Sequence, residues 1–559
     1  MKKPIPIGLG DFKKLITNEL YYIDKTLFIK EFIESSENAI LISRPRRFGK
    51  TLNLSMLKYF FDIRSKKDTK DLFRGLKIEN ERKIMELKGE YPVIFITFKN
   101  MRYFTYEDFI DGMRTLLSNL YKEHEYLLKS DKLSQIDKKD YIDIIARKSS
   151  TAAICNGISS LITYMNKHYG RKVMLFIDEY DVPLQESYIR GFYDNMIIII
   201  RNLLISALTD NVYLEKAMIT GILKIDNENI FSDLNNLYIS TLLDSKFNDK
   251  FGFTELEIGE FLRYYNLSDK NEEIKTWYNG YNFGGQVIYN PWSVLNYIDN
   301  YEAGFMLYWI NSSSNDLVNT LLLKGDNNLK IELQELMEGK SINKIIDDNI
   351  VMSEVEYSNE NIWSFLTLSG YLKAVKTGVV RGRLHCNLKI PNKEVLIFYK
   401  SLIEKWFNKV MTNDCYKIML ETLTSGNITI FEGIFKEFVI NNLSYFDVSG
   451  KEPERIYYAF VLGMFVSLSN EYEVKSNKES GYGIYDVMII PKDISKIGII
   501  IEFKKISYFL NSTIEEAAKT ALKQIEEKKY EIELLQRGIK NIIKIAIVFK
   551  GNEIKIAQK

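Results

Sequence analysis

Short, continuous apolar runs mark the first 225 residues of the chain. They lie at residues 39–43, 92–98, 173–177 and 216–220, and long segments with helical spacing separate them. A run of this length that is apolar throughout is typical of a strand buried on both faces of a parallel sheet. The pattern therefore predicts an α/β domain with a parallel sheet in this part of the chain.

The pattern changes twice further along. Residues 250–300 are helical and aromatic, and residues 325–400 mix short strands, loops and helices without a clear order. A second α/β pattern begins near residue 430, with an amphipathic helix, two strands, a charged helix and a last strand at 543–549. We expect the aromatic side chains of 250–300 to form a core rather than a surface on which bases stack. These side chains are Trp277, Tyr278, Tyr281 and Trp292.

Composition narrows the classes of protein and of site. The 559-residue chain holds 75 basic and 74 acidic residues, so any nucleic-acid surface must be a local cluster of Lys and Arg. The three cysteines lie far apart, which excludes a disulfide scaffold and a cysteine zinc site and fits a reducing compartment. No signal peptide or membrane span is recognisable, so we expect a cytoplasmic protein without a membrane partner.

The first candidate site follows the first apolar run. The loop reads SRPRRFGKT at 43–51, and apolar residues recur at helical spacing behind it. Strand, loop and helix start are the context of a phosphate-binding loop. Gly49 would let the backbone approach a phosphate, Lys50 would reach the terminal phosphates, and the Thr51 hydroxyl would bind Mg²⁺. Arg44 stands where such a loop usually has its first glycine.

Two acidic residues follow the apolar run at 173–177. Asp178 and Glu179 stand at the C-terminal end of a predicted buried strand, where open α/β sheets bind ligands. Asp178 is predicted to hold Mg²⁺, directly or through water, and Glu179 to orient and activate the attacking water. The alternative is that the two acids only begin an exposed turn.

These residues together resemble the AAA-ATPase-like family of bacterial proteins, whose members typically carry a C-terminal nuclease-like domain. The resemblance covers most of residues 4–300 and rests on YYIDKT (21–26), SRPRRFGKT (43–51), IDEYDVPL (177–184), TGILKI (220–225), FSDLNNL (231–237) and YNPWSVLNYI (289–298). It implies an AAA-like P-loop domain that binds ATP with Mg²⁺, followed by a lid or winged-helix-like extension. Arg44 then belongs to the usual form of this family's loop.

The resemblance suggests roles for the three loop arginines and for two further residues. Arg44, Arg46 and Arg47 are expected to contact the phosphates or a neighbouring subunit, or else to form a solvated basic turn. Thr220 is placed like the polar sensor of related ATPases, although an ordinary threonine at a strand end fits equally well. One expected arrangement is a homo-oligomer in which a neighbour supplies an arginine, and Arg201 is a candidate for that arginine.

The second candidate site lies in the C-terminal pattern. Asp486 belongs to YDVMIIP, and Glu502 and Lys504 belong to IIIEFKK. Residues two apart in a strand share a face, so Glu502 and Lys504 project together, next to Asp486 if the two strands form a hairpin. Two converging carboxylates can bind one or two divalent cations, and Lys504 can position water and stabilise developing phosphate charge. Glu454, on an otherwise apolar helix face, needs a partner or a metal to offset its desolvation.

This second pattern resembles the PD-(D/E)xK nuclease superfamily over roughly residues 430–550, with a polar Gln524 on the following helix. The resemblance implies Mg²⁺ or Mn²⁺ bound by Asp486 and Glu502. It also implies four catalytic residues: Glu454, Asp486, Glu502 and Lys504. One departure is Tyr485, which stands where the superfamily's name has proline.

The predicted architecture has an AAA-like domain at 1–240, a helical lid or winged-helix-like and connecting region at 241–400, and a restriction-endonuclease-like α/β domain at 401–559. The leading hypothesis is an ATPase coupled to a metal-dependent nuclease that acts on nucleic acid, with DNA the expected substrate. The alternative is a protein whose nucleotide state switches its binding of nucleic acid or protein, with a nuclease-like domain that does not cut. A helicase-type motor lacks the expected series of motifs.

Overall fold

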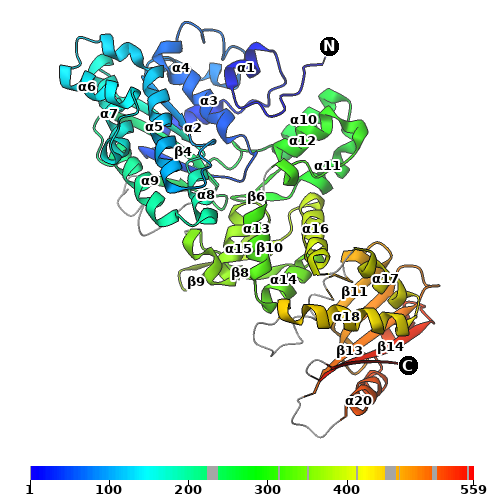
Figure 1. Ribbon diagram of the computed structural model, residues 1–559. Coiled ribbons are helices and arrows are strands. Elements are labelled where there is room, and N and C mark those ends of the chain that lie inside the picture. The colour runs from blue at the N-terminus through cyan, green and yellow to red at the C-terminus, as the bar shows by residue number, and fades with distance from the viewer. Residues whose placement is uncertain are drawn as a thin grey trace. The chain divides into compact units, whose positions relative to one another are not determined.

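The computed structural model describes residues 2–222, 237–312, 315–348, 350, 352–410, 413–446, 461, 463–464, 466–506, 513–550 and 553–559. They form two compact units, residues 1–324 with 338–396 and residues 325–337 with 397–559 (Figure 1). Glu454, residues 223–225 and residues 231–236 lie outside the described residues. Among the helices that are described, none combines the length and the apolar character that a membrane crossing requires.

A parallel five-stranded sheet forms the centre of the first unit. Its strand order is β2-β3-β4-β1-β5, and all neighbouring strands run parallel. The strands are β1 (Ala39–Ser43), β2 (Val93–Thr97), β3 (Val173–Asp178), β4 (Leu214–Gly221) and β5 (Leu237–Ser240). The apolar runs predicted to be strands are β1 to β4, which confirms the α/β prediction. Strand β5 was not predicted, because four residues carry little pattern.

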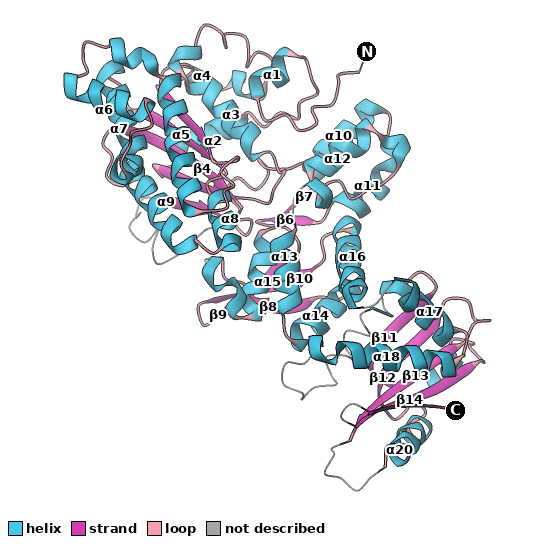
Figure 2. Ribbon diagram, in the orientation of Figure 1, coloured by secondary structure: helices cyan, strands magenta, loops and turns pink. Residues whose placement is uncertain are grey.

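Helices cover this sheet (Figure 2). Helix α3 contacts β2, β3 and β4, whereas α7 contacts β3 and α9 contacts β4. The Ser150 side chain caps the start of α7, and Gly170 ends that helix at a φ of 67°. The helices of this part are α1 (Phe12–Thr17), α2 (Leu27–Glu34), α3 (Lys50–Phe61), α4 (Arg82–Met85), α5 (Tyr106–Glu123), α6 (Gln135–Ile145), α7 (Thr151–Tyr169), α8 (Val182–Arg190) and α9 (Tyr193–Leu208).

The first unit continues with a helical part and a small antiparallel sheet. Tyr278 and Tyr281 are buried and Trp277 packs against the core of the helical part, as predicted. The elements are α10 (Glu255–Tyr265), α11 (Asn271–Tyr278), β6 (Tyr281–Phe283), β7 (Gln286–Ile288), α12 (Pro291–Asp299), α13 (Asp316–Lys324), β8 (Ile342–Ile345), α15 (Asn359–Leu368), β9 (Lys373–Val380) and β10 (Arg383–Lys389). Strands β6 and β7 form a hairpin, and the other three form a sheet in the order β8-β10-β9.

The second unit contains another five-stranded sheet, in the order β11-β12-β13-β14-β15. Strands β13 and β14 run parallel, and the other neighbours run antiparallel. The strands are β11 (Tyr472–Ser480), β12 (Gly483–Pro491), β13 (Gly498–Lys505), β14 (Ile542–Lys550) and β15 (Glu553–Gln558). The helices are α14 (Asn327–Met337), α16 (Lys393–Val410), within which the boundary between the units falls, α17 (Asn413–Thr424), α18 (Ile428–Phe446), α20 (Ile514–Glu527) and α21 (Ile532–Gln536).

Helix α20 connects β13 to β14 and covers one face of this sheet. Thr513 and Glu516 form a capping box at its start, and Ala518 and Ala521 pack on β14. The two predicted strands, the charged helix and the strand at 543–549 are confirmed. The prediction that this strand is the last one was wrong, because β15 follows it and forms a hairpin with it.

Candidate functional site

The loop between β1 and α3 has the backbone that its sequence predicts. Gly49 adopts a φ of 85°, which favours glycine, and helix α3 begins at the next residue, Lys50. Lys50 is buried, and its Nζ atom donates to the carbonyl oxygens of Arg44 and Pro45, each at 2.9 Å. Burial lowers the pKa of the Lys50 ammonium. A buried cation thus lies within the curve of the loop.

The prediction that Arg44 contacts phosphate or lies in a solvated turn was wrong, because this side chain packs inside the fold. Its side chain is fully buried, and its guanidinium donates to the carbonyl oxygens of Ser43 and Ser240 at 2.8 and 2.9 Å. The same group lies 5.3 Å from the centre of the Phe283 ring, and burial lowers its pKa to about 10. The arginine at the usual glycine position therefore ties β1 to β5, and it is absent from the lining of the cavity described below.

Asp178 brings together the two halves of the predicted phosphate site. Its Oδ2 atom accepts from the Thr51 hydroxyl at 2.8 Å, and its Oδ1 atom accepts from the Thr220 hydroxyl at 2.8 Å. These contacts form because β1, β3 and β4 are parallel neighbours whose carboxyl ends meet at one edge of the sheet. Burial raises the pKa of the Asp178 carboxyl.

Sequence reasoning missed two neighbouring polar residues. Asp181 is buried, and its Oδ2 atom accepts from the Ile222 amide and the Gln185 side chain, both at 2.8 Å. Gln185 in turn accepts from the Arg46 guanidinium at 2.8 Å. The signal was the spacing of Asp181 and Gln185, four residues apart, which places them on one face of a helix. Burial raises the pKa of Asp181.

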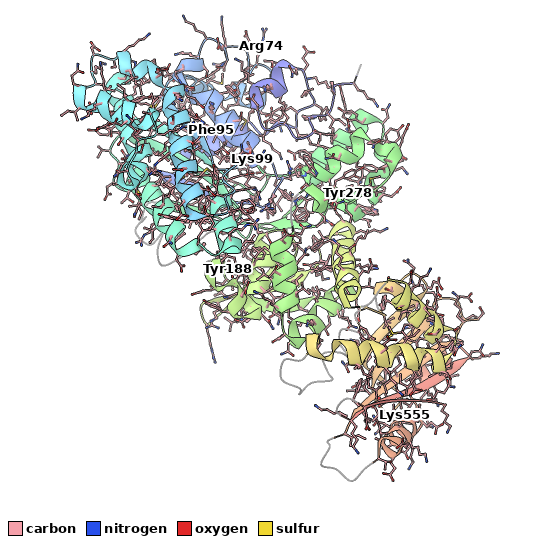
Figure 3. All side chains as sticks on the ribbon, in the orientation of Figure 1. Arg74, Phe95, Lys99, Tyr188, Tyr278 and Lys555 are labelled. Carbon is pink, nitrogen blue, oxygen red and sulfur yellow. The ribbon has the colours of Figure 1, made fainter. Side chains whose placement is uncertain are left out.

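A cavity of about 390 Å³ opens beside this network. The predicted residues that line it are Arg46, Arg47, Gly49, Lys50, Thr51 and Glu179. Glu179 has a φ of 52°, a left-handed conformation that is uncommon outside glycine. The lining also includes Tyr21, Tyr22, Trp292 and Lys99. Figure 3 labels Lys99.

Trp292 departs from its predicted place in a core, because it lines this cavity. The Arg47 guanidinium lies over its ring, 4.1 Å from the ring centre, and its indole N–H donates to the Tyr308 carbonyl at 3.0 Å. An aromatic ring and a basic side chain thus stack on each other within the lining of the cavity.

In the second unit, Asp486 and Glu502 lie opposite each other on neighbouring strands. The register of β12 and β13 pairs Val487 with Ile501, so the next residues along, Asp486 and Glu502, share a face. The Asp486 Oδ2 atom accepts from the Phe503 amide at 2.7 Å. Burial raises the pKa of Asp486. The predicted hairpin is confirmed.

Only one of the two carboxylate oxygens of Glu502 accepts hydrogen bonds from the described residues. Its Oε1 atom accepts from Lys504 at 3.2 Å and from Gln524, on α20, at 2.5 Å. Its buried Oε2 atom has no hydrogen-bond partner among the described residues. Burial, and then the charge of Asp486, raises the pKa of Glu502 to about 7.

Gln524 links the remaining members of this cluster. Its carbonyl oxygen accepts from Lys504 at 2.7 Å, and its amide donates to the Tyr530 hydroxyl at 3.2 Å. Tyr485 is buried, and its side chain is not among those around Glu502. Over the described ranges, no group of three or more His, Cys, Asp or Glu side chains could hold a metal. The cluster there consists of two carboxylates, since Glu454 lies outside those ranges.

Two family models match the chain. Residues 6–231 match the AAA-ATPase-like family, described as a predicted AAA-ATPase, and residues 452–559 match a model of the PD-(D/E)XK nuclease superfamily. The chain therefore contains an AAA-ATPase-like domain and a PD-(D/E)XK nuclease superfamily domain, which confirms both resemblances.

A curated relative matches a longer stretch. The "uncharacterized protein in vnfD 5'region" of Azotobacter chroococcum mcd 1 is 24% identical over 442 residues, which cover 78% of this chain and 77% of the relative. The similarity is therefore wider than either domain alone. The relative's name assigns no activity.

Proposed function

We propose that this protein is an ATPase joined to a metal-dependent nuclease whose substrate is DNA. The first unit would bind ATP with Mg²⁺ in the cavity beside the loop at 43–51 and hydrolyse it. The second unit would cut the phosphodiester backbone at Asp486 and Glu502. The two family matches support the two classes of domain, and the residues of each site support the chemistry.

The ATP site is supported by groups that converge on one place. Lys50 and the free N–H groups at the start of α3 would bind phosphate oxygens, which would replace the loop carbonyls as partners of Lys50. Thr51 and Asp178, whose side-chain oxygens lie 2.8 Å apart, are oxygen ligands of the kind that Mg²⁺ prefers. Bound Mg²⁺ neutralises phosphate charge. Glu179, in the lining of the cavity, would orient the attacking water.

The single observation that carries the nuclease assignment is the Oε2 atom of Glu502. A buried carboxylate oxygen without a partner is costly, and a divalent cation between it and Asp486 would offset that cost. Bound Mg²⁺ or Mn²⁺ supplies Lewis acidity and lowers the pKa of water. Lys504, held by Gln524, would stabilise negative charge on the phosphate.

A cleavage assay tests the nuclease half. The full chain is mixed with supercoiled plasmid, linear duplex and single-stranded DNA, with Mg²⁺, Mn²⁺ or EDTA, and with or without ATP. Cleavage should require the metal and disappear in Glu502→Ala and Asp486→Ala. Glu553→Ala, at an exposed glutamate of the same sheet, should cut normally. Cleavage that persists in both active-site variants would refute the assignment.

An assay of phosphate release tests the ATPase half. Lys50→Ala should abolish Mg²⁺-dependent hydrolysis of ATP, because the phosphates lose their buried cation. Lys67→Ala removes an exposed lysine outside the cavity and should hydrolyse ATP at the normal rate. Normal turnover by Lys50→Ala would show that the catalytic site lies elsewhere.

A further inference from the structure

The hairpin formed by β9 and β10, residues 373–389, carries an unbalanced charge. It holds five Lys and Arg residues and neither Asp nor Glu, in a chain whose net charge is +1. The stretch without acidic residues extends from 361 to 393. A local cluster of this kind is what contacts with a nucleic-acid backbone require. We call residues 373–389 the basic hairpin.

The charges lie on the solvent side of the basic hairpin. Alternate residues of a strand share a face, so Arg383 and Lys389 point away from the side that buries Cys386 and Leu388. Arg381 lies in the turn with a φ of 51°, ahead of Gly382. Arg381, Arg383 and Lys389 are all exposed.

No acidic partner balances these side chains. In the described part of the chain, Arg381, Arg383 and Lys389 form no ion pair, whereas Arg102 and Arg537 are each paired with glutamate.

Two of the lysines even face each other. Lys373 and Lys389 are directly opposite in the register of β9 and β10, an arrangement that costs stability. Burial, and then the charge of Lys389, lowers the pKa of Lys373. A bound polyanion would remove this repulsion, so the arrangement points to a ligand with a row of negative charges.

We propose that the basic hairpin binds the phosphate backbone of duplex DNA. A two-stranded ribbon fits the major groove of B-DNA, and a turn with arginines at its tip can reach the phosphates on the groove's edge. The inference rests on the proposed function, because that function names DNA as the substrate. It requires neither ATP hydrolysis nor cleavage, because the basic hairpin lies wholly within residues 338–396 of the first unit.

Binding of a fluorescent DNA duplex to the full chain tests this inference. The Glu502→Gln background and EDTA prevent cleavage, and anisotropy is measured over a series of NaCl concentrations. The triple variant R381Q/R383Q/K389Q should bind on the order of 100-fold more weakly at low salt. The slope of log K against log salt should become shallower by about 3, since three phosphate contacts are lost.

A matched variant and a stability measurement control this experiment. K129Q/K139Q/K148Q removes three exposed lysines of the same unit and should keep the affinity and salt slope of the parent. Thermal unfolding should show the hairpin variant to be at least as stable as the parent, because it removes the repulsion between Lys373 and Lys389. If the hairpin variant unfolds at a lower temperature than the parent, the single variant R383E replaces it in the binding measurement, because it reverses only one exposed charge.

The outcomes separate this inference from the proposed function. An unchanged salt slope in the hairpin variant, or tight binding of single-stranded DNA or RNA with none of duplex, would overturn the inference. If the wild-type protein cuts DNA and the hairpin variant binds and cuts it equally well, the hairpin assignment fails and the nuclease assignment stands. If the hairpin variant loses binding while Glu502→Ala cuts like wild type, the hairpin assignment stands and the nuclease assignment fails.

Discussion

The two candidate sites differ in how many of their carboxylate oxygens accept hydrogen bonds from the protein. In the first unit both oxygens of Asp178 accept from hydroxyls, those of Thr51 and Thr220. In the second unit Glu502 has two donors on one oxygen and none on the other among the described residues. A ligand at Asp178 would therefore have to replace existing hydrogen bonds, whereas a cation at Glu502 would contact an oxygen that no described residue contacts. The proposed first site is stabilised by its own hydrogen bonds, and the proposed second site would gain stability from the cation.

The largest expected effect comes from replacing Arg44 with the glycine that other phosphate-binding loops have at this position. Arg44→Gly should destabilise the first unit by about 3–5 kcal/mol, because it leaves a cavity and strips the Ser43 and Ser240 carbonyls of their donor. Chemical denaturation of the full chain measures this loss. Arg47→Gly, in the same loop at a φ of 68°, should cost no stability. Equal stability of both variants would contradict the structural role of Arg44.

A second substitution tests whether the Thr51 hydroxyl acts as a ligand. Thr51→Val keeps the shape of the side chain but removes its oxygen, so the rate of ATP hydrolysis should fall about 100-fold, or about 2.7 kcal/mol. Thr51→Ser keeps the hydroxyl and should retain most of the rate. Turnover of Thr51→Val at the wild-type rate would remove Thr51 from the Mg²⁺ site. DNA cleavage without ATP should be unaffected in either variant.

The places of Asp178, Asp486 and Glu502 in the fold could be predicted from the sequence, because these residues lie on buried strands whose pattern is strong. Asp178 and Glu502 end or interrupt continuous apolar runs, which places them at known positions of a sheet. The roles of Arg44 and Trp292 could not be predicted in this way. Arg44 is buried by β5 and Phe283, and Trp292 is brought to the cavity by packing of residues far away in sequence.

The basic hairpin shows another limit of prediction from the sequence. Its charge is visible in the sequence, but the pairing of its strands contains a bulge, so the pattern does not show which charges share a face. Only the register of β9 and β10 places Lys373 opposite Lys389. Long-range pairing, rather than local propensity, decides such surfaces.

The pH dependence of stability offers a further test of the contrast between Asp178 and Glu502. Its pKa is raised to about 7, so the folded protein holds this proton more tightly than the unfolded chain does. The resulting stability is present near pH 5 and is lost as the pH rises through 7, by about 2 kcal/mol. Thermal unfolding in EDTA from pH 5 to pH 8 should show this loss in the wild type and not in Glu502→Gln.

Divalent cations should oppose this loss of stability at high pH. At pH 8, Mg²⁺ or Mn²⁺ should stabilise the wild-type protein, because it binds the ionised carboxylate, and should have less effect at pH 5, where protons compete. Glu502→Gln should respond weakly at both pH values. Parallel curves for the two proteins, with and without the metal, would show that Glu502 neither titrates near pH 7 nor binds the cation.

The smallest predicted effect concerns Gln524, which touches both Lys504 and Glu502 but would not contact the reacting atoms. Gln524→Leu should slow DNA cleavage about tenfold, or about 1.4 kcal/mol, since Lys504 loses a partner at 2.7 Å that fixes its position. It also removes a donor to the Glu502 carboxylate, so the pKa of Glu502 should rise and the pH–rate profile should move to higher pH. Gln536→Leu, at an exposed glutamine of α21, should change neither. A tenfold slower enzyme with an unshifted profile would mean that Gln524 only packs against its neighbours, whereas a shifted profile would place it in the control of the carboxylate's charge.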